Sequence, residues 1–129
     1  MFKKILVFLI LFFELHFAFP ETIDTTLINP EQKQDSFKNF LRINYKDLIS
    51  FYNEKIMMAD YLGAIFYAKM AFAKATNTLE MLETLFLIAS AYEKNGDDKE
   101  AKLIYRQVIE NYSDNKSFVE LAKIKLLAI

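Results

Sequence analysis

The sequence predicts an all-α protein in which about five helices stack as antiparallel pairs into a short α-solenoid. Three observations support this fold class. From about Ser36 onward, apolar residues recur at intervals of three and four, and no stretch alternates as a strand does. That part of the chain contains both glycines and no proline. The breaks between the periodic segments are roughly two to five residues long, so neighbouring helices must run antiparallel.

Residues 1–20 have the layout of a secretory signal. Lys3 and Lys4 precede an unbroken apolar run of nine residues, 5–13, and a charged start followed by a short apolar stretch is typical of such signals. The run is shorter than the roughly 20 apolar residues that span a bilayer. We therefore expect export to the periplasm or cell envelope. Residues 1–20 are then either cleaved or retained as an inner-membrane anchor.

The charge of the remaining chain gives no reason to expect a nucleic acid partner. Of 16 Lys/Arg only Lys3 and Lys4 lie in the first twenty residues, and of 17 Asp/Glu only Glu14 does, which leaves a formal charge of about −2. We therefore expect no nucleic acid, and membrane contact only through residues 1–20 if these are uncleaved. The excess of Lys over Arg is typical of an AT-rich bacterial genome.

A non-periodic segment and two helices are expected before the helix pair that has the clearest start and stop signals. Residues 21–35 lack periodicity and are predicted to be a linker or, from the capping signal at 29–32, an early helix start. Residues 36–129 are predicted to be the helical domain. The first helix should end near Met58, and the second should run to about Ala75, with Asp60 as its cap. The expected inner face of the first helix comprises Leu41, Tyr45, Leu48, Phe51 and Tyr52.

The next three helices carry clear start and stop signals. Residues 77–80 form a capping box that opens the third helix. Gly96 suits the left-handed conformation after that helix, and Asp97 should cap the fourth. Ser117 should start the fifth helix. The expected apolar faces are Leu79, Leu82, Leu85, Phe86, Ala89 and Tyr92 in the third helix, and Ala101, Ile104, Tyr105, Val108 and Ile109 in the fourth.

The third and fourth helices place bulky, small and aromatic residues at the offsets of a 34-residue template. The matching positions are Leu85, Ile88, Ala89, Tyr92, Gly96, Ala101 and Tyr105. On these residues the chain resembles the tetratricopeptide repeat (TPR) family over 82–115, and less regularly over 45–129. It departs from the family pattern by having Ser113 where a proline usually ends the unit, and by lacking tryptophan.

The residues needed for the common catalytic and metal sites are scarce. The single histidine, His16, lies in the predicted leader, and cysteine is absent, which leaves no Cys/His or Ser/His pair and no standard zinc site. Two isolated glycines cannot form a phosphate-binding loop. The acidic residues 97–100 are favoured at a helix start by the helix dipole alone. We therefore expect no enzymatic activity, no cofactor and no metal.

The resemblance implies a non-catalytic adaptor or scaffold that binds a protein or peptide in a groove lined by the first helix of each pair. The groove positions transferred from the family are Lys46, Ile49, Asn53, Glu83, Phe86, Ser90 and Lys94. The second helix is apolar nearly all round, which predicts an interface for self-association or docking at Phe66, Met70 and Phe72. Two alternatives remain: a membrane-anchored structural subunit of an envelope complex, and a carrier of small apolar ligands.

Overall fold

The computed structural model describes residues 38, 39 and 41–129. The predictions for residues 1–20 and 21–35 therefore lie outside the described part of the chain. Residues Tyr45–Ile129 form one compact unit. It contains the helices α3 (Tyr45–Met57), α4 (Tyr61–Lys74), α5 (Thr78–Asn95), α6 (Asp98–Asn111) and α7 (Lys116–Ala128). No strand occurs among the described residues, and the all-α prediction is confirmed.

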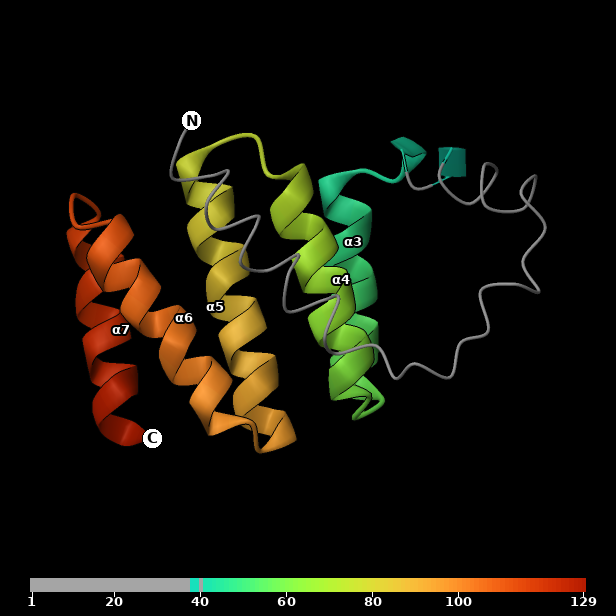
Figure 1. Ribbon diagram of the computed structural model, residues 1–129. Coiled ribbons are helices and arrows are strands. Elements are labelled where there is room, and N and C mark those ends of the chain that lie inside the picture. Colours follow the sequence, from blue (N-terminus) through green and yellow to red (C-terminus); the bar gives the residue numbers. More distant parts are fainter. Residues whose placement is uncertain (1–37, 40) are drawn as a thin grey trace, which may run out of the picture. The chain divides into compact units, whose positions relative to one another are not determined.

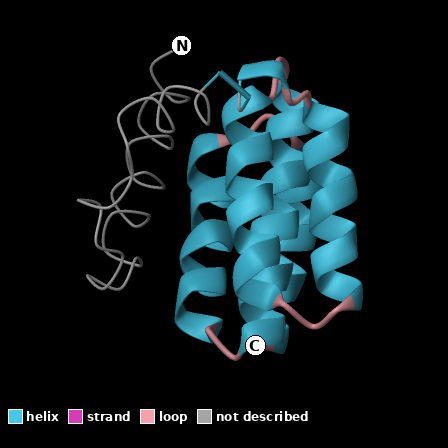
Figure 2. Ribbon diagram, turned by 90° about the vertical axis from the view of Figure 1, so that its right-hand side faces the viewer, coloured by secondary structure: helices cyan, strands magenta, loops and turns pink. Residues whose placement is uncertain are grey.

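Each helix of the compact unit packs on the next one in the sequence, from α3 through to α7. Figure 1 shows the five helices following one another across the molecule in that order. Figure 2 shows the connecting loops at the two ends of the helices, as short antiparallel connections require. The predicted stack of antiparallel pairs, a short TPR-like solenoid, is therefore confirmed.

The first helix of the unit begins later than the periodicity suggested. We expected the helical pattern from about Ser36, but Ile43 and Asn44 are not helical and α3 begins at Tyr45. The other predicted boundaries lie within two residues of the observed ones. The last helix begins at Lys116 after Asn115, ahead of the expected start at Ser117.

The turns between the helices confirm most of the predicted signals. The Asp60 carboxylate accepts from the backbone N–H of Gly63 at 3.0 Å, and Gly96 has φ +83°. The Asn77 side chain accepts from the N–H of Glu80 at 2.9 Å. The prediction for Asp97 is only half right. It occupies the N-cap position of α6 but makes no side-chain capping bond, because its carboxylate instead accepts from the Asn95 amide at 2.6 Å.

The core lies between successive helices and is built largely from alanine, leucine and tyrosine. Its fully enclosed residues include Leu48, Ala64, Ala68, Leu82, Leu85, Ile88, Ala89, Ala101, Tyr105 and Val108. Small alanines let the helix backbones approach closely, and the larger side chains fill the space beside them. Three residues expected on inner faces, Leu41, Phe51 and Leu79, are exposed. In the compact unit, Leu79 lies in the first turn of α5 and Phe51 on α3, the first helix of the stack, so fewer neighbours cover them.

Candidate functional site: the layer of α3, α5 and α7

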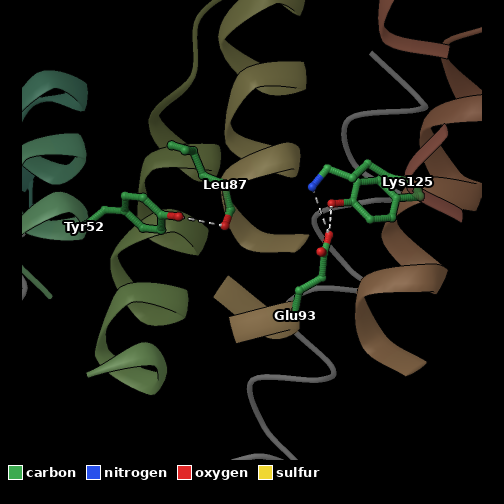
Figure 3. A network of polar contacts seen from close by, with 5 residues as sticks. Tyr52, Leu87, Glu93 and Lys125 are labelled. Carbon is green, nitrogen blue, oxygen red and sulfur yellow. Dashed lines mark hydrogen bonds and ion pairs between the residues drawn. The ribbon is translucent and has the colours of Figure 1, made fainter. Parts of the chain in front are cut away.

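Two tyrosines of α3 join that helix directly to α5. The Tyr45 hydroxyl donates to the carbonyl of Glu80 at 3.5 Å, and the Tyr52 hydroxyl donates to the carbonyl of Leu87 at 3.2 Å (Figure 3). The two tyrosines are two helical turns apart, so they lie on the same side of α3. Helices α3 and α5 therefore lie side by side, although α4 separates them in the sequence.

Burial shapes the chemistry of the contact between α3 and α5. The pKa of Tyr52 is raised, chiefly because burial disfavours the phenolate and in spite of a side-chain hydrogen bond with Ser90 that acts the other way. Burial likewise raises the pKa of Tyr45, with a smaller contribution from the negative charge of Glu83. Both hydroxyls therefore remain neutral donors at ordinary pH.

The opposite side of α5 contacts α7. The ring of Phe86 lies 5.5 Å from that of Phe118 on α7 and 5.4 Å from that of Tyr105 on α6. The Glu93 carboxylate accepts from the Tyr105 hydroxyl and pairs with Lys125 of α7 at 3.7 Å (Figure 3). Helix α5 thus contacts both α3 and α7, and these three helices form one layer of the stack.

The predicted groove residues all lie in this layer, but their side chains differ in solvent exposure. Lys46, Asn53, Glu83 and Lys94 are exposed, whereas Ile49, Phe86 and Ser90 are half-buried. Ser90 hydrogen-bonds Tyr52 across the contact between α3 and α5, and Phe86 packs between α6 and α7. Phe86 therefore has a structural role of its own, and its replacement would disturb the helix packing as well as any binding.

The predicted apolar interface on α4 needs a correction. Phe66 is exposed and Met70 is half-buried, but Phe72 is only 1 % exposed and belongs to the core. The assignment of Phe72 to an exposed interface is wrong, because α4 packs between α3 and α5 and this side of it is covered. Phe66 also contacts the ring of Tyr67 at 5.4 Å, and Tyr67 contacts Phe51 at 5.3 Å.

Two features were missed in the sequence. Lys69 is buried, and its Nζ donates to the Tyr92 hydroxyl at 2.8 Å. The signal was present, since Lys69 is one of two charges in an otherwise apolar helix. The second feature is a row of exposed apolar residues on α7, namely Leu121, Ile124 and Leu127. Their spacing of three places them on one face, opposite the buried Val119 and Ala122.

Within the described residues, no helix is both long and apolar enough to cross a membrane. The same part of the chain contains no group of three or more His, Cys, Asp or Glu residues that could hold a metal ion. The candidate site consists of the exposed side chains on the layer of α3, α5 and α7.

The comparisons with known proteins agree with this geometry over one helix pair. A tetratricopeptide repeat model matches residues 83–115, which cover most of α5 and all of α6. No curated protein and no solved structure matches the chain significantly. Proteins of this repeat family are typically protein-interaction modules without catalytic activity. The α5–α6 segment, residues 83–115, is similar to a tetratricopeptide repeat, and the predicted resemblance is confirmed for that part of the chain.

Proposed function

We propose that this protein is an exported, non-catalytic interaction module that binds a peptide or a segment of another protein along the layer of α3, α5 and α7. The observation that carries the proposal is the continuous layer itself, joined by the hydroxyls of Tyr45 and Tyr52 on one side of α5 and by Glu93 on the other. Stacked helical repeats use such a layer as an extended binding surface.

The burial pattern supports the transfer of groove positions from α5 to α3. Leu48 and Leu85 are both fully buried, Tyr52 and Ala89 are both buried, and in each pair the second residue follows the first by 37 positions. The same offset relates Asn53 to Ser90. The two helices thus present equivalent faces, and these faces carry polar groups that can hydrogen-bond a partner's backbone.

Asn53 is the sharpest probe of this surface because it is exposed and its position is equivalent to Ser90. The full chain would be used to capture partners from an envelope extract, and the affinity of each purified partner would then be measured by calorimetry. We expect Asn53→Ala to weaken binding, while the neighbouring Glu54→Ala leaves it unchanged. Glu54 is also exposed, and it lies about 100° around α3 from Asn53. Equal affinity in wild type and in Asn53→Ala would contradict the assignment of this face.

Export is the second element of the proposal and has its own test. It rests on the charged start and apolar run of residues 1–20. N-terminal sequencing of the native protein should find a start near Phe19 or Glu21. A start at Met1 in the membrane fraction would instead support the anchored structural subunit.

A further inference from the structure

The turn between α5 and α6 contains the only Asn-Gly pair of the chain, Asn95-Gly96. An asparagine in this position is prone to deamidation, because glycine has no side chain to hinder the attack of its own backbone nitrogen on the asparagine side chain. Both residues are exposed to solvent. Asn95 is therefore the asparagine of this chain whose side-chain amide is most readily converted to a carboxyl group without an enzyme.

The reaction needs only this turn and water. The backbone nitrogen of Gly96 forms a bond to Cγ of Asn95 while the bond from Cγ to Nδ2 breaks. Ammonia leaves and carries away the proton of the Gly96 N–H, and a cyclic succinimide remains. Water then opens this ring at either of its carbonyl carbons. The products are aspartate or isoaspartate at position 95, and in isoaspartate the main chain runs through the former side chain.

The folded turn holds the attacking nitrogen away from this reaction. Gly96 has φ +83° and ends α5. Its N–H donates to the carbonyl of Glu93 at 3.0 Å, and the N–H of Asp97 donates to the carbonyl of Tyr92 at 2.9 Å. These are the two hydrogen bonds of a Schellman motif. Cyclisation requires the bond from Gly96 to break and the helical backbone of Asn95 to turn, so it depends on local opening of the helix end.

The side chain of Asn95 is held as well, and its loss would change the turn. Its Nδ2 donates to the Asp97 carboxylate at 2.6 Å. Deamidation replaces this donor with a carboxylate, so two negative charges meet where a hydrogen bond was. The new charge also lies at the C-terminus of α5, where the helix dipole disfavours it. Isoaspartate in addition lengthens the main chain within the Schellman motif.

We propose that Asn95 is a deamidation site controlled by the α5–α6 turn. The intact Schellman motif suppresses the reaction, opening of the turn permits it, and the carboxylate that forms weakens the turn afterwards. The modification thus acts on the helix pair that resembles the tetratricopeptide repeat. No binding partner takes part in it, and it is therefore independent of the proposed function.

The first test compares the folded and the unfolded chain. The full chain is incubated at mildly alkaline pH in buffer and in guanidinium chloride, and deamidation at each asparagine is measured by peptide mass spectrometry. Asn95 should react at least about tenfold faster in guanidinium chloride, as expected for a turn that is open only a small part of the time. In the same denaturant it should react faster than Asn53 and Asn77, which precede Glu54 and Thr78. Equal rates for the three asparagines, or equal rates for Asn95 in the two solvents, would overturn the proposal.

The second test measures what the product does to the turn. Asn95→Asp reproduces the aspartate product, whereas Asn95→Ser removes the amide without adding a charge. Both variants release the Asp97 carboxylate from its bond to Asn95, so the difference between them isolates the new charge. By thermal unfolding at neutral pH, Asn95→Asp should have a Tm roughly 2–4 °C below that of Asn95→Ser, and added salt should reduce this difference. The same Tm for both variants would contradict the proposed weakening of the turn.

Discussion

The turns that close the two helix pairs offer a reciprocal test of the backbone geometry. Ala59, between α3 and α4, has φ +56°, and Gly96, between α5 and α6, has φ +83°. The two residues are 37 positions apart, the same offset that relates the buried residues of α3 and α5. Both turns therefore use the left-handed conformation, but only one of them carries the residue that adopts it without strain.

The size of the effect follows from the backbone alone. A left-handed conformation costs an L-residue about 1–2 kcal/mol, while glycine loses roughly 0.5–1 kcal/mol more conformational entropy on folding than alanine does. The difference predicts that Ala59→Gly stabilises the protein by about 0.5–1 kcal/mol. Gly96→Ala should destabilise it by a similar amount. A methyl group at Gly96 would meet no atom within 4 Å, so no steric contact adds to the cost.

Thermal and urea unfolding followed by far-UV circular dichroism would measure both changes. For a domain of 60–100 residues, 1 kcal/mol shifts Tm by about 4–8 °C, so we expect shifts of roughly 2–8 °C in opposite directions. The urea m-value should not change, because neither substitution alters the surface exposed on unfolding. A lower Tm for Ala59→Gly, or an unchanged Tm for Gly96→Ala, would refute the left-handed geometry of these turns.

Two further predictions concern tyrosine hydroxyls and an acid-sensitive cap. The buried Tyr112 hydroxyl has no hydrogen-bond partner among the described residues, so Tyr112→Phe should be neutral or stabilising. Tyr52→Phe loses its bond to α5 and should cost about 1 kcal/mol. Urea unfolding compares the two, and a larger loss for Tyr112→Phe would contradict the packing described above. Two hydrogen bonds lower the pKa of Asp60 below its ordinary value of 3.8, chiefly the one with the Lys55 side chain and secondly the one from the backbone N–H of Gly63. Its stabilising contribution is therefore complete above pH 3.8 and is lost as the pH falls through the folded-state pKa. As the pH is lowered below about 5, the Asp60→Asn variant should lose less stability than the wild type does. Identical pH profiles of Tm for the two proteins would count against this cap.

The sequence by itself determined the helices and most of their ends. Helix starts and stops depend on local chemistry, since a capping side chain or a left-handed residue acts within one turn of the backbone it serves. Asp60, Asn77 and Gly96 could therefore be identified without knowledge of their neighbours in space. The TPR resemblance over 82–115 could also be recognised from the sequence, because its signature is a fixed spacing of residue types along one helix pair.

The tertiary structure alone decided which faces are covered. Periodicity shows that a helix has an apolar side, but the neighbouring helices determine how much of that side is buried. Phe72 was predicted to be exposed and is enclosed because α5 packs on α4. Leu79 was predicted to be inside and is exposed at the start of α5.

The same reason accounts for the candidate site. The polar positions Asn53 and Glu83 could be named from the repeat register. The sequence could not show that Phe86 and Ser90 are half-buried and make contacts within the helix stack. The exposed row of Leu121, Ile124 and Leu127 on α7 was missed because apolar residues at helical spacing are also what a buried face contains. Its exposure comes from the packing of the stack, in which α6 and α5 contact one side of α7 and the described residues leave this row uncovered. Local chemistry sets where helices form, and the packing of helices distant in sequence sets what their surfaces are free to bind.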